Sequence, residues 1–242
     1  MKAAHPSRSR ALFCAAALAA MTALTGMSSP CQAALTLRPG GLNEGDLFRV
    51  LFISSARRDA LSSDIAAYDS FIASLAASAG IDTYFGTPVT WQVLGSTFAV
   101  SAIDRVALDS VALFSMSGVK VADSGADLWD GSIDAPIQAD EGGRFNDGLV
   151  HTGTRPDGRA ADDPLGGRAL LITELGLSST VVTDRNWVSA GAGSGATRHF
   201  LYGVSSVLTV PPALNTVPVP GSLALAALAL LALAATAQVR QR

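Results

Sequence analysis

A run of 17 uncharged residues, from Gly221 to Ala237 and nearly all leucine and alanine, limits the possible folds of this chain more than any other feature. Arg240 and Arg242 follow it at once. A helix that is apolar on every side has no face for water, and a run of this length is long enough to span a thin bilayer. Basic residues directly after an apolar span favour keeping that end in the cytoplasm. The sequence therefore predicts a transmembrane helix and arginine tail over residues 221–242.

The N-terminal end is biased in a different way. The first ten residues carry three bases and no acid, residues 11–26 are mostly apolar, and Cys31-Gln32-Ala33 ends in a small residue. This order of a basic, an apolar and a small-residue region is that of a secretory signal peptide. We expect a signal peptide over residues 1–33 with cleavage at Ala33, which leaves one domain over residues 34–210.

Cysteine use and charge exclude two classes of function. The only cysteines, Cys14 and Cys31, lie in the predicted signal peptide, so the mature chain has no disulfide or thiolate chemistry. Five of the 17 basic residues lie in the two ends, whereas all 20 acidic residues lie between them. A body with more acids than bases does not suit binding to phosphate backbones, and we predict no nucleic-acid partner.

Residues 211–220 form a proline-punctuated linker that cannot continue a helix or a strand. Its end, Pro218-Val219-Pro220, together with the apolar run and the arginines, resembles the PEP-CTERM sorting segment of Gram-negative bacteria. In that family a Pro-Glu-Pro motif precedes the helix, and an exosortase recognises the tail. Val219 stands where the family has glutamate, so the tail is either a processed signal or a plain anchor. The resemblance implies an exosortase-type partner, export across the inner membrane, and a location in the cell envelope or extracellular matrix with at least transient membrane anchoring.

The body mixes helix and strand signals. Residues 47–54 are branched and aromatic, which predicts a strand. Residues 62–80 predict a helix with Ser62-Ser63 at its N-cap, Asp64 in its first turn and apolar residues at helical spacing up to Gly80. Further strands are expected over residues 90–96, 111–116 and 200–210, with long loops rich in glycine and aspartate between them. This pattern predicts an α+β fold.

A second resemblance rests on the order of several short segments. These are Trp91 to Thr97, Val111 to Ser115 with Gly118, Leu128 to Gly131, His151 to Thr154, Asn186-Trp187 and the closing segment around Tyr202. Their order is similar to that of endostatin-like members of the C-type lectin-like fold, which implies a single α+β domain with long loops. Residues 126–137 and 201–210 also resemble a body found in other PEP-CTERM proteins. The family's calcium- and sugar-binding motifs and its disulfide cysteines are absent, so calcium-dependent sugar binding is not implied.

Four aspartates form the strongest candidate for a metal site. Asp123, Asp127, Asp130 and Asp134 are spaced by four, three and four positions, and Asp140 and Glu141 follow closely. On one helical face these carboxylates would repel one another unless a cation such as calcium, which prefers oxygen ligands, were bound. The alternative is that Gly125, Gly131 and Pro136 break the helix and the aspartates form turns. Calcium is the only cofactor that the sequence suggests.

No catalytic motif is recognisable in the body. His151 and His199 are distant in sequence and lack the paired spacing of a zinc site. Ser194 lies in a glycine-rich stretch, residues 191–195, that matches neither a nucleophile elbow nor a phosphate loop and predicts a flexible loop. The three tryptophans are assigned to the core. We predict a non-enzymatic surface or matrix protein that binds polysaccharide or a surface protein; the alternatives are a secreted hydrolase using His151 or His199 and a structural component of the biofilm matrix.

Overall fold

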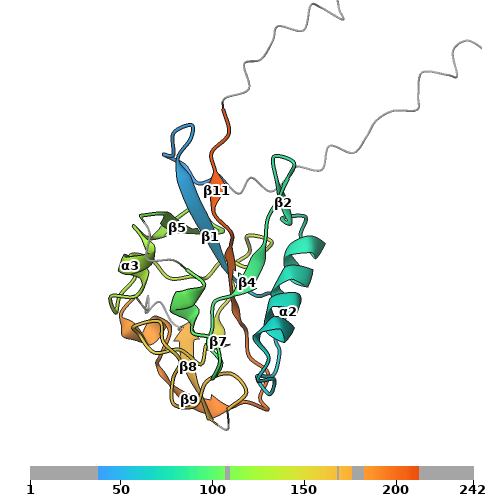
Figure 1. Ribbon diagram of the computed structural model, residues 1–242, viewed down its shortest axis with the longest axis vertical. Helices are drawn as coiled ribbons and strands as arrows, with labels where there is room; N and C mark the ends of the chain where they lie inside the picture. Colours follow the sequence, from blue (N-terminus) through green and yellow to red (C-terminus); the bar gives the residue numbers. More distant parts are fainter. Residues whose placement is uncertain (1–37, 107–109, 168, 176–182, 213–242) are drawn as a thin grey trace, which may run out of the picture. The chain divides into compact units, whose positions relative to one another are not determined.

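A computed structural model describes residues 38–106, 110–167, 169–175 and 183–212, which belong to one unit of the chain (Figure 1). The described body is α+β, as predicted. The predicted signal peptide, the motif Pro218-Val219-Pro220 and the predicted transmembrane helix lie outside the described residues. Within the described part, no helix combines the length and the apolar character needed to cross a membrane.

The central sheet is built around the strand β1 (Leu47–Ile53). Its strands follow the order β4-β10-β1-β5-β6, and β11 pairs with the start of β1. The partners are β4 (Trp91–Val93), β5 (Ala112–Ser115), β6 (Lys120–Ala122), β10 (Tyr202–Ser205) and β11 (Leu208–Thr209). β1 runs parallel to β5 and antiparallel to β10 and β11, so the first and last strands of the body lie side by side.

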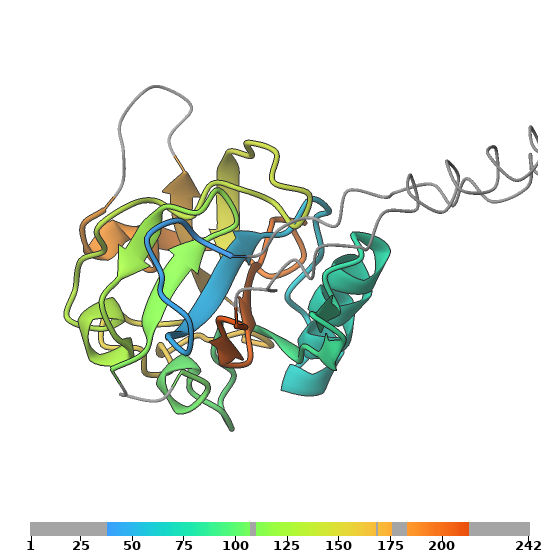
Figure 2. The same ribbon diagram turned by 90° about the horizontal axis from the view of Figure 1, so that it is seen from above.

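Both faces of β1 are largely buried, which explains why every residue of the strand except Arg49 is apolar. Phe48 and Phe52 belong to the apolar cluster that includes the helix α2, whereas Leu51 and Ile53 belong to a second cluster on the other face. Figure 2 shows α2 on one side of the sheet, with the loops on the other. Trp91 lies in the first cluster, and Trp129 and Trp187 lie in the second, so the predicted core role of the tryptophans is confirmed.

The helix α2 (Ile65–Ser78) is the long helix expected from the sequence. Its N-cap is Asp64, whose carboxylate accepts a hydrogen bond from the Ala66 amide at 3.0 Å, so the prediction of Ser62-Ser63 as the cap was wrong by one to two positions. Tyr68, Ile72 and Ala76 form its buried face. The helix ends before Gly80, which has a φ of +72°.

The remaining elements are short. A second sheet has the order β7-β8-β9, and a small hairpin joins β2 to β3. The bounds are β2 (Thr83–Tyr84), β3 (Thr87–Pro88), β7 (Gly148–His151), β8 (Ala169–Leu175), β9 (Gly191–Ser194), the helix α3 (Gly125–Leu128) and the 3-10 helices η2 (Ala102–Asp104) and η3 (Arg185–Trp187).

Three sequence predictions need correction. Residues 191–195, predicted as a flexible loop, contain β9, which pairs with β8 along its whole length. The strand predicted over 200–210 is interrupted at Ser206 and Val207, and the one predicted over 90–96 is confined to β4. Glycine and alanine are depleted in strands, so the composition of β9 gave no strand signal.

Candidate functional site

The best-formed candidate site surrounds a tight turn over residues 139–145. Ala139 and Phe145 face each other as a bridge, and the Asp140 amide donates to the Arg144 carbonyl at 2.8 Å. The Asp140 carboxylate caps the turn by accepting from the Gly142 and Arg144 amides, each at 2.9 Å. Because the amide of Ile53 donates to the Ala139 carbonyl at 3.0 Å, the turn is fixed to the end of β1.

An open pocket of about 250 Å³ is lined by one side of this turn and by the turn between β5 and β6. The lining residues carry no formal charge: Ser117, Val119, Ala135, Pro136, Gln138, Ala139, Gly143 and Phe145. The Phe145 side chain is 69% exposed although its backbone is fixed in the turn, and Val119 is 51% exposed. An apolar surface with a few neutral hydrogen-bonding groups suits a neutral ligand better than an ion.

The other side of the turn lines a second, more polar pocket of about 380 Å³ next to the end of α2. Glu141 is 5% exposed and accepts hydrogen bonds from the amide of Ser55, at 2.9 Å, and from its hydroxyl. Asn146 donates to the Ser54 carbonyl at 3.1 Å. These bonds join the turn to the segment after β1, so Asp140 and Glu141 hold the turn in place. Neither residue belongs to the group formed by Asp123, Asp127 and Asp134.

The structure brings together three of the four aspartates proposed as calcium ligands. Carboxylate oxygens of Asp123, Asp127 and Asp134 lie within 4.8 Å of one another. Asp130 is separate and accepts hydrogen bonds from the amide and hydroxyl of Ser132, which is a turn role. α3 begins at Gly125 and ends at Leu128, so the four residues do not share one helical face.

A lysine already provides positive charge to this aspartate group. The Lys120 ammonium lies 2.5 Å from an Asp123 oxygen and 3.3 Å from an Asp134 oxygen. These hydrogen bonds raise the pKa of Lys120 above its ordinary value. The Asp127 carboxylate accepts from the Asp123 amide at 2.7 Å. The repulsion that suggested calcium is therefore offset by groups of the chain itself.

The two histidines, 48 positions apart, meet in the structure. The rings of His151 and His199 are in edge contact, with centroids 4.6 Å apart. His151 closes β7, and His199 exchanges two backbone hydrogen bonds with Arg58, of 2.9 and 3.0 Å. Burial lowers the pKa of both imidazoles; His199 lowers that of His151 further, and Arg57 lowers that of His199. The pair is therefore neutral at neutral pH.

The His151 ring contacts the backbone of the segment before His199. The His151 Nε2 atom lies 2.8 Å from the Thr197 carbonyl oxygen, and its Nδ1 atom is buried without a hydrogen-bond partner in the described part of the chain. Among the residues that the structure describes, no serine hydroxyl and no carboxylate is hydrogen-bonded to the ring of His151 or His199. A catalytic nucleophile and its base are normally hydrogen-bonded to each other. Ser194 lies in β9 and accepts from the Ala196 amide through its hydroxyl oxygen.

Phe145 was missed in the sequence because a single phenylalanine between charged and polar residues resembles an ordinary turn. The only signal was its neighbourhood: Phe145 follows Gly142-Gly143-Arg144 and has no apolar residue within two positions on either side. The chain matches no protein-family model, and it has no significant match among curated proteins.

Proposed function

We propose that this chain is an exported, surface-sorted and non-enzymatic protein whose body has an endostatin-like variant of the C-type lectin-like fold. Two features support the fold proposal. The strand β1 pairs with β10 and β11, which joins the two ends of the body, and α2 follows β1 directly. Long irregular segments between α2 and β10 carry the candidate pocket.

The proposed activity is binding of a neutral exopolysaccharide at the pocket beside residues 139–145. The observation that carries it is the Phe145 ring, which is exposed at the edge of an uncharged pocket and is held by a capped turn. The negative face of an aromatic ring attracts the C–H groups of a sugar, and Gln138 and Ser117 offer hydrogen bonds to its hydroxyls. Because the turn is held in place before binding, little ordering entropy is lost.

The proposed location is the cell envelope or the extracellular matrix. The basis is the sequence of the two ends: the signal-peptide pattern over residues 1–33, and the variant motif Pro218-Val219-Pro220 before the apolar run. An exosortase-type enzyme is the proposed processing partner. Until processing, the apolar run anchors the body to the membrane.

Glycan arrays and polysaccharide pull-downs on the detergent-solubilised chain, with and without calcium, test the binding proposal. Phe145→Ala is expected to weaken binding about tenfold, which corresponds to about 1.4 kcal/mol. Phe98→Ala is the matched control, because Phe98 is 67% exposed but does not line the pocket. Binding that calcium does not change is expected. Failure to bind any glycan, or equal binding by the two variants, would overturn the proposal and favour a purely structural matrix role.

A further inference from the structure

We propose that the tip of the β2–β3 hairpin, formed by Phe85 and Gly86, contacts the lipid headgroup region of the membrane that anchors the chain. This inference rests on the membrane anchoring in the proposed function. It assigns an orientation to the body, with the hairpin towards the bilayer and the sugar pocket free of it.

The first observation is an unusual turn residue. Tyr84 pairs with Thr87, which leaves Phe85 and Gly86 as a two-residue loop. Their φ values are +48° and +79°, and Phe85 is the only residue other than glycine with a positive φ in the described chain. Two-residue hairpin loops of this kind favour Asn-Gly or Asp-Gly, and a bulky side chain in the left-handed region is strained. Strain at such a position points to a role for the side chain outside the fold.

The second observation is how the ring is presented. Phe85 is 62% exposed, whereas Tyr84 beside it is 8% exposed. The two rings are in edge contact, with centroids 4.8 Å apart, and Tyr84 in turn contacts Phe48 of β1 at 5.8 Å. The core thus supports Tyr84, and Tyr84 supports an aromatic ring that points into solvent.

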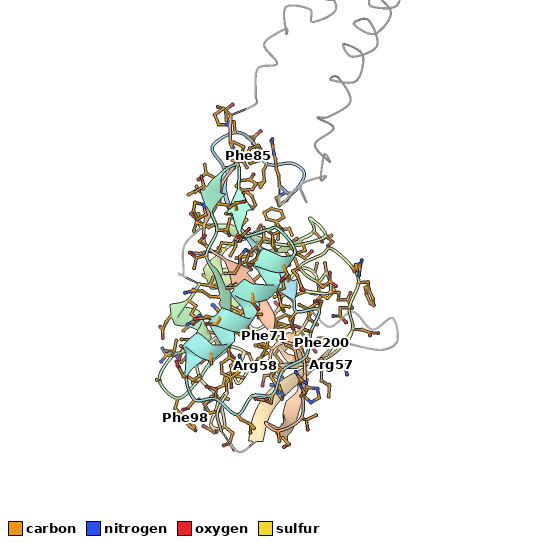
Figure 3. All side chains as sticks on the ribbon, turned by 90° about the vertical axis from the view of Figure 1, so that its right-hand side faces the viewer. Arg57, Arg58, Phe71, Phe85, Phe98 and Phe200 are labelled. Atoms are coloured by element: carbon orange, nitrogen blue, oxygen red, sulfur yellow. The ribbon has the colours of Figure 1, made fainter. Side chains whose placement is uncertain are left out.

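The third observation is where the hairpin lies. Figure 1 places β2 and β11 at the same end of the described body, and Figure 3 shows Phe85 at that end and Phe98 at the opposite end. The described chain reaches Pro212 three residues after β11, and β11 pairs with β1 beside Leu47, which is 49% exposed. Eight residues, 213–220, separate Pro212 from the apolar run. An extended chain covers at most about 3.6 Å per residue, so this end of the body lies within roughly 30 Å of the membrane.

Lipid suits this tip better than a charged partner does. The tip residues Phe85 and Gly86 carry no charge, and Asp82 lies at the base of the hairpin. Burial raises the pKa of the Tyr84 hydroxyl, and Arg38 opposes this rise. Exposed phenylalanine, tryptophan and leucine side chains bind a bilayer by burying their apolar surface at the boundary between the headgroups and the acyl chains. The contact is therefore expected to depend little on salt or on anionic lipid.

Tryptophan fluorescence in the full-length chain tests this orientation. The three native tryptophans are at most 7% exposed, so they are shielded from lipid. The Phe85→Trp and Phe98→Trp variants are reconstituted in vesicles of phosphatidylethanolamine and phosphatidylglycerol, with and without brominated acyl chains. The added emission of Phe85→Trp should shift to shorter wavelength and be largely quenched by the brominated lipid, whereas that of Phe98→Trp should be unchanged.

Flotation of the same vesicles separates the possible failures. If the chain floats with the lipid but Phe85→Trp is quenched no more than Phe98→Trp, the hairpin contact is wrong and the anchor stands. If the emission of Phe85→Trp shifts equally with and without bromine and is not quenched, the tip contacts protein, which also overturns the inference. If the chain does not float, both the anchor and the hairpin contact are wrong.

Discussion

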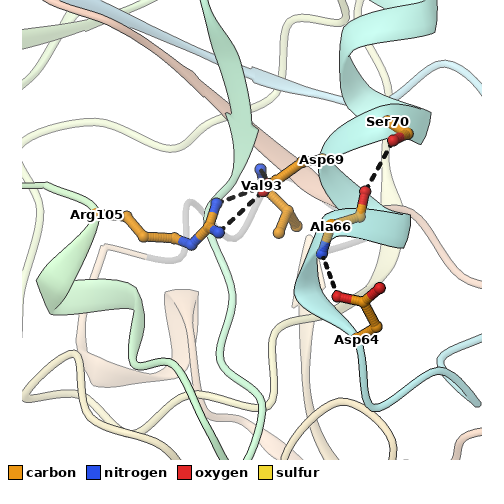
Figure 4. A network of polar contacts seen from close by, with 6 residues as sticks. All are labelled: Asp64, Ala66, Asp69, Ser70, Val93 and Arg105. Carbon is orange, nitrogen blue, oxygen red and sulfur yellow. Dashed lines mark hydrogen bonds and ion pairs between the residues drawn. The ribbon is translucent and has the colours of Figure 1, made fainter.

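Arg105 and Asp69 form a two-pronged ion pair that fixes α2 to the segment after η2 (Figure 4). The Arg105 Nη1 and Nη2 atoms lie 2.6 and 2.9 Å from the two carboxylate oxygens of Asp69. Their side chains are only 9% and 23% exposed, respectively. The same carboxylate accepts the Val93 amide of β4 at 2.8 Å, so one aspartate connects the helix, the sheet and a loop.

Asp69→Ala is therefore expected to destabilise the fold by about 2–4 kcal/mol, because it leaves a largely buried guanidinium and a strand amide without their acceptor. Asp64→Ala on the same helix is the control, since loss of an N-cap costs about 1 kcal/mol. Thermal or urea unfolding followed by tryptophan emission measures both. Adding Arg105→Leu to Asp69→Ala should recover part of the loss. Equal destabilisation by Asp69→Ala and Asp64→Ala would contradict the role given to the ion pair.

Gly203 allows α2 to pack closely on β10. A Cβ atom at this position would lie 2.6 Å from the Phe52 ring and 2.9 Å from Ile72, which are both fully buried. Gly203→Ala should cost about 1–3 kcal/mol through overpacking. A Cβ atom at Gly191 in β9 would have no neighbour within 4 Å, so Gly191→Ala should change stability by no more than about 0.5 kcal/mol. A Gly203→Ala variant as stable as the parent chain would show that α2 can move away without cost.

The strand β1 and the helix α2 were predictable from the sequence, because the signals for both are local. β1 is rich in branched and aromatic residues despite Arg49, and α2 repeats its apolar residues at helical spacing up to Gly80. The N-cap of α2 was predicted at Ser62-Ser63 instead of Asp64. The ion pair was not predictable, because Asp69 and Arg105 are 36 positions apart and nothing local marks them as partners. The same holds for the histidines, which meet only because β7 and the segment before β10 come together.

The candidate site was only partly predictable. The aspartate spacing placed Asp123, Asp127, Asp130 and Asp134 on one helical face, whereas in the structure three of them lie close together and Asp130 is separate. The spacing could not show that Lys120 lies among them. The pocket depends on a turn fixed by the Asp140 carboxylate, and its key side chain, Phe145, carries no periodic signal. An apolar run or an apolar repeat at helical spacing identifies a buried element in the sequence. The exposure of a single aromatic residue such as Phe145 becomes known only from the three-dimensional structure.

The aspartate group leads to a prediction about metal. Calcium at about 1 mM, the range of weak extracellular sites, should not stabilise the parent chain, because the Lys120 ammonium already pairs with Asp123 and Asp134 and would have to be displaced. Lys120→Gln removes that charge and should make the unfolding temperature rise with added calcium. Magnesium, which requires stricter geometry, serves as the control ion. Stabilisation of the parent chain by calcium, with no gain in Lys120→Gln, would show that the lysine does not compete.

The tail gives a prediction about release. Val219 replaces the glutamate of the motif that the tail resembles, so Val219→Glu should increase release of the body from the membrane in a host that has an exosortase. Val219→Gln keeps the approximate size and polarity without the charge and separates recognition of a carboxylate from a change in shape. Cell fractionation and blotting measure the released share. Equal release of the parent chain and of both variants would mean that the exosortase does not recognise the side chain at position 219.

The histidine pair predicts how stability depends on pH. In the folded chain burial lowers the pKa of His151 and of His199 below the ordinary value of 6.5. Arg57 adds to this effect on His199, whereas the hydrogen bond with the Thr197 carbonyl and, less strongly, Asp59 oppose it on His151. The unfolded state therefore binds more protons near pH 6, and the free energy of unfolding falls as the pH drops through about 6.5. Urea unfolding between about pH 7.5 and pH 5, above the range where most carboxylates titrate, should show this loss. His199→Gln removes one of the two titrating rings and should make the loss smaller. An acid slope that is unchanged in His199→Gln, or a parent chain that gains stability on acidification, would mean that the two rings are not coupled to folding in this way.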